Sequence, residues 1–340
     1  MIELDGNIGG GQVLRTALAI AALQGKPIHI YNIRGAREQP GLRPQQRAVV
    51  DCLAELTDGS VSSTAIGTTE LTFSPTAICT GEFEIDIGTA GSVFLLCDAI
   101  LPLATSIDAP LTVHITGGTD VKWAPPSTTY RSVKLPILRR YGLNAEVIIE
   151  RHGFYPAGGG QVTLRLLPST MTEIDVGPRE QVRSVSIEAV VGKKLRDALV
   201  AERHVAAVED CLDHLQLSAE DRSSRYVSSD SPGSVVSATL DTGAHMAGFD
   251  AIGERGVPAE QISQRVCDAI NMFLDSSAAI DSHMADQLLI WLAIAGGHLT
   301  IPQATDHVQS QLAVLETFGY AFEQVVNLST LDIITPEDDN

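Results

Sequence analysis

Apolar and polar residues near the start of the chain follow patterns that predict alternating strands and helices. Residues 27–33 alternate between apolar and polar side chains, as a half-buried strand does. Residues 12–23 form a run of mostly Leu, Ala and Ile after three glycines, which predicts a buried helix. Residues 44–56 carry apolar side chains at positions 49, 50, 53 and 56, so they predict an amphipathic helix.

The same succession recurs further along the chain. Strands are predicted at residues 70–73, 82–87, 111–115, 145–151 and 299–301, and helices at 93–104, 133–141 and 278–297. These elements return in units of about 70–90 residues, which we interpret as an internal structural repeat. The sequence GTAGS at 88–92 precedes its helix as the first glycines precede theirs.

The pattern changes near residues 177–178, which suggests an inserted module. Strands are predicted at 185–191 and 234–240, with helices at 198–214 and 258–274. We therefore predict an α/β (α+β) protein, with a large repeat-built domain at 1–180 and 276–340 and a small α/β domain inserted at 181–275. The acidic last residues, 336–340, are expected to be disordered.

Composition narrows the functional classes. The formal net charge is −19, which disfavours sequence-independent binding to long nucleic-acid duplexes. Aromatic residues make up 5% of the chain, which also argues against a protein built mainly as a base-stacking platform. The five cysteines form no CxxC pair, so neither a zinc site nor a disulfide framework is expected.

Nothing in the sequence predicts association with a membrane. The residues after Met1 do not resemble a signal peptide, and the apolar runs at 16–23 and 288–297 are too short to cross a bilayer. We therefore expect a cytoplasmic protein.

The pentapeptide GGGQV occurs twice, at residues 9–13 and 158–162. A glycine run before a helix allows backbone N–H groups to face an anion, and Gly10 and Gly11 precede Gln12 in this way. Neither copy matches a Walker A loop, and on the glycines alone a plain tight turn is the favoured interpretation. We expect the second copy to occupy an equivalent place in another repeat, as a structural turn.

Arginines are concentrated in the first fifty residues of this acidic chain. They are Arg15, Arg34, Arg37, Arg43 and Arg47. Guanidinium groups bind phosphate oxygens in pairs, so the cluster favours a small phosphorylated ligand or a nucleic-acid end. For any single arginine, a surface ion pair is the commoner role.

The nine histidines show neither HxH nor HExxH spacing, so a histidine metal site has little support. His204 and His214 lie on the acidic helix and are expected to be solvated. His307 follows Thr305 and Asp306 at a predicted helix start, where the helix end favours a neutral imidazole and an approaching phosphate.

Several segments together resemble the RNA 3′-terminal phosphate cyclase family. They follow one another in order: DGNIGGGQVLRTAL (5–18), IRGAREQPGLRPQQ (33–46), GTAGS (88–92), GGTDVKWAPP (117–126), RHGFYPAGGGQV (151–162), HMADQL (283–288) and ATDHVQSQLAVLETF (304–318). The resemblance implies three repeats, each of two helices on a four-stranded sheet, plus a smaller insert. It also implies a ligase that converts an RNA 3′-phosphate and ATP into a 2′,3′-cyclic phosphate, AMP and pyrophosphate.

The resemblance also implies roles for individual residues. His307 would be the nucleophile that carries AMP, and Arg34, Arg37 and Arg15 would bind phosphates. ATP would be contacted by the residues that match the family's binding segments: His283, Met284, Ala285, Asp286, Gln287, Asp98, Gln45, Gly10, Gly11 and Gln12. Mg²⁺ or Mn²⁺ would accompany the nucleotide. The oligomeric state is left open, with a homodimer as one alternative.

The sequence departs from the family pattern at several of these positions. The loop before the glycines is two residues shorter and lacks the usual metal-binding glutamate, which leaves Asp5 as a weak candidate for a metal ligand. Asp98 replaces a common glutamine, and its carboxylate would repel a triphosphate unless a cation intervenes. His283 replaces a tyrosine that could stack on adenine.

Two other functions fit the same residues. A non-catalytic cyclase-like protein would bind RNA or assist ribosome assembly, and the missing glutamate favours this alternative. A transferase of the related repeat architecture would act on a small phosphorylated metabolite and would be indifferent to RNA ends.

Overall fold

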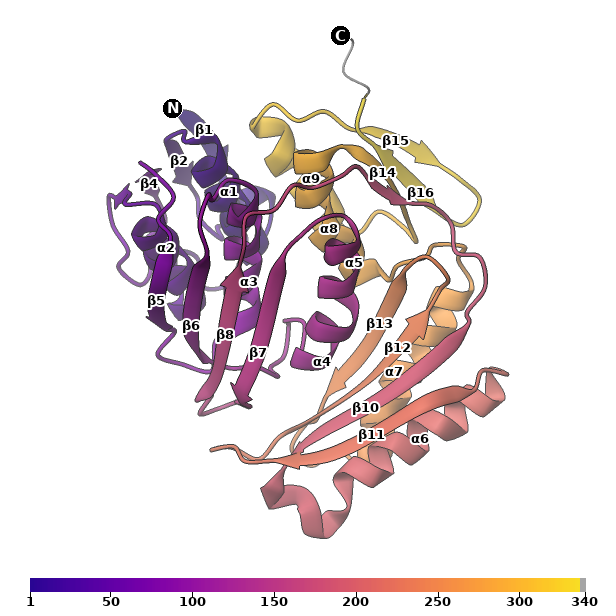
Figure 1. Ribbon diagram of the computed structural model, residues 1–340. Coiled ribbons are helices and arrows are strands. Elements are labelled where there is room, and N and C mark those ends of the chain that lie inside the picture. Colours follow the sequence, from indigo (N-terminus) through magenta and orange to yellow (C-terminus); the bar gives the residue numbers. More distant parts are fainter. Residues whose placement is uncertain (337–340) are drawn as a thin grey trace.

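The computed structural model describes residues 1–336 and contains four sheets of four strands each (Figure 1). The first sheet has the order β1-β2-β4-β3 and carries two helices. Its elements are β1 (Ile2–Asp5), α1 (Gly11–Gln24), β2 (Ile28–Tyr31), α2 (Pro44–Leu56), β3 (Ser60–Val61) and β4 (Leu71–Ser74).

The second unit repeats this plan with the sheet order β5-β6-β8-β7. Its second helical segment is broken into α4, a π-helical turn at Tyr130–Lys134, and α5. The elements are β5 (Gly81–Asp86), α3 (Val93–Ile100), β6 (Leu111–Gly117), α4 (Ser127–Thr129), α5 (Leu135–Arg140), β7 (Ala145–Arg151) and β8 (Gly160–Leu166).

The third unit has the order β15-β16-β14-β9 and draws its strands from distant parts of the chain. It comprises β9 (Ile174–Val176), α8 (Ser282–Ala295), β14 (Gly297–Ile301), α9 (Asp306–Thr317), β15 (Glu323–Val326) and β16 (Leu331–Ile334). In each unit the first strand pairs in parallel with the second, and the remaining pairs are antiparallel. The predicted repeat and α/β (α+β) class are confirmed.

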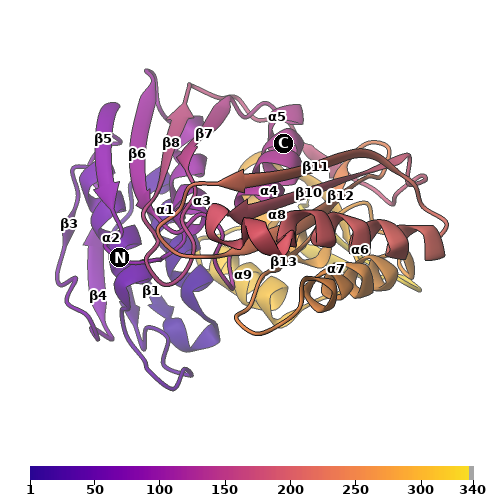
Figure 2. The same ribbon diagram turned by 90° about the horizontal axis from the view of Figure 1, so that it is seen from below.

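Between β9 and α8 the chain forms a separate sheet with the order β11-β10-β12-β13. Figure 2 shows α6 and α7 side by side against this sheet. Its elements are β10 (Ser184–Gly192), α6 (Val200–His214), β11 (Ala219–Val227), β12 (Ser234–Asp241), β13 (Met246–Ile252) and α7 (Ala259–Leu274). Their apolar side chains form a core of their own.

Helix α1 lies at the centre of the three units. It packs against α2, α3 and α9, and ten of its fourteen residues are buried. This burial on several sides explains the unbroken run of Leu, Ala and Ile, because a helix enclosed by other helices has no polar face. The start of α1 is thereby held beside the start of α9.

The two GGGQV copies are not structurally equivalent, which corrects the prediction from sequence. The first copy opens helix α1, whereas the second ends in strand β8 after two glycines with positive φ, Gly158 and Gly159. The segment 88–92, before α3, occupies the place in the second unit that the first glycine run occupies before α1. The expectation for residues 337–340 lies outside the described residues.

Candidate active site

His307 is the second residue of α9, and its side chain is exposed. Thr305 caps this helix, since its hydroxyl accepts a hydrogen bond from the Val308 amide at 3.2 Å. Ser310 Oγ donates to the His307 carbonyl at 3.0 Å and accepts from Gln12 Nε2 at 3.1 Å. These bonds fix the start of α9 against the start of α1.

The glycines at the start of α1 permit close approach by neighbouring groups. A Cβ on Gly9 would lie 3.0 Å from Ser310 Cβ, and one on Gly10 would lie 3.0 Å from Arg37 Nη2. Gly10 is the N-cap of α1, and no side chain caps its free N–H groups. Uncapped N–H groups beside a guanidinium form a favourable place for an anion.

Arg34 supports the loop that carries Arg37. Arg34 Nη1 donates to the carbonyl oxygens of Gln39 and Gly41, both at 3.0 Å. Burial lowers the pKa of Arg34, and the positive charges of Arg37 and Arg43 lower it further. Arg34, Arg37 and Arg43 therefore lie near enough for their charges to interact, and their binding of phosphate stays a prediction.

A small charged pocket lies deeper, beneath the start of α1. Arg15, Asp98, Lys134 and Asp286 line it, together with the side chains of Gln287, Trp291 and Gln311. Lys134 Nζ lies 2.5 Å from Asp98 Oδ1 and donates to Gln287 Oε1 at 2.9 Å. The side chains of Lys134 and Asp98 are only 3% and 11% exposed, so this ion pair is shielded from water.

The titration of Asp286 links this pocket to His307. Burial raises the pKa of Asp286 to about 6, and positive charges on four nearby groups oppose the shift: His307, His283, Lys134 and Arg15. Burial also lowers the pKa of Arg15, which the carboxylates of Asp98 and Asp286 oppose. The predicted nucleophile and several predicted ATP contacts therefore share one electrostatic environment.

The model of the family described as RNA 3′-terminal phosphate cyclase matches residues 7–323 of the chain. The chain belongs to the RNA 3′-terminal phosphate cyclase family. A protein named RNA 3′-terminal phosphate cyclase from Halobacterium salinarum is 38% identical over 332 residues, covering 94% of this chain and 95% of its own. Proteins with the same name from Pyrobaculum neutrophilum and Ectopseudomonas mendocina are each 37% identical, covering 93% of this chain and 92% of their own.

This membership confirms the family inferred by resemblance and the assignment as an enzyme of that family. Within residues 1–336, no helix combines the length and the apolar character needed to cross a bilayer. A cytoplasmic location stays a prediction.

In this cyclase family member, the segment predicted to contact ATP divides into two groups. Asp286 and Gln287 line the charged pocket, whereas the side chains of Met284 and Ala285 are buried in the core and leave only their main chain for a ligand. Gln45 lies between units, since its Nε2 donates to the Ser92 carbonyl at 3.2 Å.

Asp5, the weak candidate for a metal ligand, is held by two hydrogen bonds in this cyclase family member. Its Oδ1 accepts from the Asn7 amide at 3.0 Å and from Asn32 Nδ2 at 3.1 Å, so the carboxylate is engaged in a turn. Within the described part of the chain, no three His, Cys, Asp or Glu side chains group as metal ligands. The residues present do not form a resident metal site.

Sequence reasoning missed Lys134, which the structure places at the centre of the charged pocket. Lys134 supplies the cation that pairs with the Asp98 carboxylate. The one available signal was a lysine inside an apolar stretch of a predicted helix, in a chain with five lysines. That signal does not identify its partner, because the two residues lie 36 positions apart.

Sequence reasoning also missed Asp250. This residue lies on β13 and brings the inserted sheet near His283. Asp250 Oδ1 accepts a hydrogen bond from Thr129 Oγ1 at 3.0 Å. Burial raises the pKa of Asp250 to about 6, the positive charge of His283 opposes the shift, and the carboxylates of Asp281 and Asp120 add to it. The folded protein thus binds the Asp250 proton more tightly than the unfolded chain does. The stability that this proton contributes is therefore lost as the pH rises through this pKa.

Replacing Asp250 by asparagine is expected to remove this loss. Above about pH 7, Asp250→Asn should exceed the wild type in free energy of unfolding by about 1–3 kcal/mol, and the difference should vanish below about pH 4. Urea unfolding at several pH values measures the effect. A difference that does not change with pH would contradict it.

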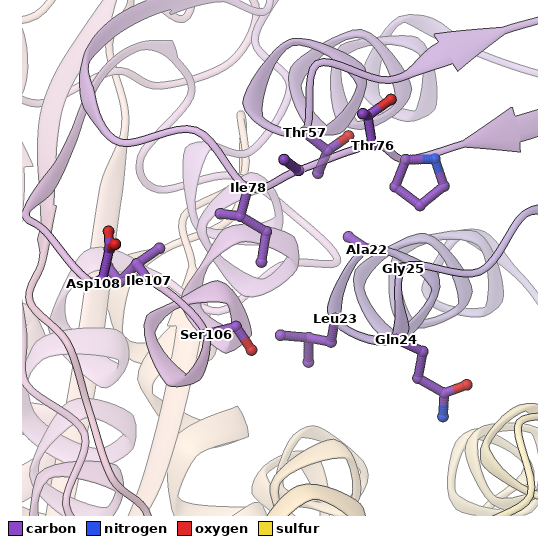
Figure 3. Close-up of a pocket in the computed structure, with 12 residues that line it drawn as sticks. Ala22, Leu23, Gln24, Gly25, Thr57, Thr76, Ile78, Ser106, Ile107 and Asp108 are labelled. Carbon is purple, nitrogen blue, oxygen red and sulfur yellow. The ribbon is translucent and has the colours of Figure 1, made fainter.

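A larger cavity than the charged pocket lies away from this site. It has a volume of about 360 Å³ and lies where α1 and α2 end, beside Gly25 and Thr57 (Figure 3). Ser106 and Asp108 complete its polar edge. Because His307 and the glycine run lie at the opposite end of α1, this cavity has no part in the chemistry derived below.

Proposed function

We propose that the protein is an ATP-dependent RNA 3′-terminal phosphate cyclase that acts through a covalent histidine–AMP intermediate. The observation that supports it most directly is the exposed His307 at the start of α9, held by Ser310 and Gln12 against the uncapped start of α1. The family membership supports RNA with a 3′-phosphate as the substrate.

The chemistry follows from the poor leaving group of the substrate. A phosphate monoester does not react with its neighbouring 2′-hydroxyl, because oxide would have to leave. In the first step, a His307 nitrogen bonds to the α-phosphorus of ATP. The bond from this phosphorus to the oxygen that bridges it to the β-phosphorus breaks, and pyrophosphate leaves. In the second, an oxygen of the RNA 3′-phosphate attacks that phosphorus and the imidazole leaves. In the third, the 2′-hydroxyl attacks the 3′-phosphorus, releases its proton to solvent and expels AMP.

Each of these steps gathers negatively charged oxygens, which nearby cations would stabilise. Arg37 lies beside the free N–H groups at the start of α1, and Arg15 and Lys134 lie in the charged pocket. A divalent ion would enter bound to the phosphates of ATP, because the described residues form no site of their own for it. No step is assigned to that ion.

The test is the conversion of a 3′-phosphorylated oligoribonucleotide in the presence of ATP and Mg²⁺. We expect a 2′,3′-cyclic end and one AMP per end. A matched oligonucleotide with a 2′-deoxy terminal nucleotide lacks the attacking hydroxyl, so its reaction should stop at an adenylated end with AMP still attached. Absence of cyclic product from the ribose substrate would reject the proposed function.

One observation favours a second candidate. The lack of a metal-ligand cluster in the described residues, together with the absent glutamate, suits a non-catalytic relative that binds RNA or assists ribosome assembly. Such a protein would bind the oligonucleotide without consuming ATP. A transferase for small phosphorylated metabolites would consume its nucleotide whether or not RNA is present, so the same assay separates all three.

A further inference from the structure

Two large aromatic side chains stand in solvent on neighbouring loops of the second unit. Trp123 is 95% exposed on the loop between β6 and α4, and Tyr155 is 75% exposed on the loop between β7 and β8. The only other tryptophan, Trp291, is 1% exposed. Exposed single aliphatic residues are common in proteins, whereas a fully exposed tryptophan in a chain with few aromatics calls for an explanation.

A buried hydrogen-bond network holds both loops. Asp120 is 1% exposed and accepts from the Ser127 amide at 2.9 Å and from the Thr119 hydroxyl at 2.7 Å. Asp120 Oδ2, which accepts from the Thr119 hydroxyl, also bonds to His152 Nδ1 at 2.9 Å. The Thr119 amide donates to the Gly153 carbonyl at 2.9 Å, which joins the bases of the two loops.

Trp123 is exposed as part of this ordered loop. Its φ is +62°, a left-handed conformation that is unfavourable for a bulky residue. Such conformations persist where the surroundings impose them, and they are concentrated at sites that bind a ligand. The backbone of Trp123 is thus held in an uncommon conformation while its side chain lies in solvent.

The segment 88–92 connects these loops with the candidate active site. Ser92 forms a β-bridge with Gly118 at the base of the Trp123 loop, and its carbonyl accepts from Gln45 Nε2. A Cβ on Gly158, which follows Tyr155, would lie 2.9 Å from Ala90 Cα. Through segment 88–92 the bases of the aromatic loops are thus joined to Gln45.

Cations accompany the two aromatic residues although the whole chain is acidic. Lys122, next to Trp123, lies 3.0 Å from Glu254, and this carboxylate is shared with Arg265. Asp230 lies against Arg151. Its carbonyl also accepts from Lys194 at 2.7 Å, and Lys193 lies next along the chain. Two cations thus share the Glu254 carboxylate, and Asp230 has Arg151 at its carboxylate and Lys194 at its main-chain carbonyl, which suits a passing phosphate backbone.

We propose that Trp123 and Tyr155 form a base-stacking surface for the nucleotides upstream of the RNA 3′-phosphate. This inference rests on the proposed function and specifies how its substrate is held. Aromatic side chains flanked by cations bind single-stranded nucleic acid by stacking and phosphate contact, with little preference for sequence. A longer oligonucleotide should therefore bind more tightly than a terminal mononucleotide, whatever its bases.

Collisional quenching of tryptophan fluorescence tests the surface without any catalysis. Acrylamide should quench mainly the exposed Trp123, because Trp291 is buried. A saturating 3′-phosphorylated hexaribonucleotide is expected to lower the quenching constant at least about twofold, whereas a nucleoside 3′-monophosphate should not. Equal quenching with and without the hexanucleotide would overturn the proposal. The proposal would also be overturned if the quenching constant changed with the protein concentration and not with the RNA.

Steady-state kinetics give a second measurement. Trp123→Ala and Tyr155→Ala should raise the KM for RNA about tenfold more than the KM for ATP, and Trp123→Phe should recover most of the loss. Met272→Ala, which removes an exposed apolar side chain from α7, is the control and should change neither value. A parallel rise of both KM values would contradict the stacking role. If no cyclic product forms even in the wild type, the proposed function fails, but the quenching result still decides the RNA surface.

Discussion

Replacing His307 by alanine is expected to reduce the transfer of AMP from ATP to the protein by about 10⁴-fold or more. The loss should be this large because His307 lies where Ser310 and Gln12 hold the start of α9 beside α1, whereas His283, a second exposed histidine at a helix start, lies on α8. Arginines would still bind the triphosphate, but no group would accept the adenylate. Incubation with α-labelled ATP and Mg²⁺, followed by denaturing gels, measures the transfer.

The adduct itself carries a second signature. A phosphoramidate on histidine is labile in acid and stable in base, so brief acid treatment should remove the label from the wild type. His214→Ala is the matched control, since His214 is an exposed histidine on α6 in the inserted module. Retention of the label in His307→Ala, or its loss in His214→Ala, would place the nucleophile elsewhere.

Replacing Lys134 by methionine is expected to destabilise the protein by about 3–5 kcal/mol. The variant would leave the buried Asp98 without its ion-pair partner and with only Arg15 nearby, and removal of one partner of a shielded ion pair costs far more than the pair contributes. The KM for ATP should also rise, because a less compensated carboxylate would then face the phosphates. Urea unfolding and the ATP dependence of AMP transfer measure the two effects.

The double variant Lys134→Met with Asp98→Asn removes both charges and should recover most of the lost stability. Arg203→Met provides the comparison for an exposed pair, because Arg203 and Glu260 are 41% and 52% exposed. That change should cost less than about 1 kcal/mol. If the double variant is no more stable than Lys134→Met, the loss does not come from the unpaired Asp98.

The order of apolar and polar residues along the chain predicted many helices and strands closely, because the burial of their side chains follows a regular period. The predicted helix at 44–56 and the predicted strand at 145–151 coincide with α2 and β7. In both, one face is buried and the other is exposed, so the periodicity of the side chains carries the information. The helix start before His307 was visible for a similar reason, since Thr305 is a typical cap.

Where local pattern failed, distant segments decided the environment of a residue. His204 lies on an acidic amphipathic helix and was expected to be solvated, yet it is fully buried and bonds to Ser263 and Ser234 at 2.9 and 3.1 Å. Burial lowers its pKa to about 4. The second GGGQV has the same residues as the first. Its glycines form a turn into a strand, because no helix follows.

By itself, the sequence determined the repeated α/β plan, the family, and the chemical type of the groups proposed for its site: a histidine at a helix start, a cluster of arginines and a glycine run. These features depend on neighbours along the chain, whose spacing sets which face is buried. Only the tertiary structure decided that Lys134 neutralises Asp98, that Asp250 reaches towards His283 from another sheet, and that Trp123 points into solvent. Such relations join residues far apart in sequence, and packing of whole elements, which no local pattern records, brings them together.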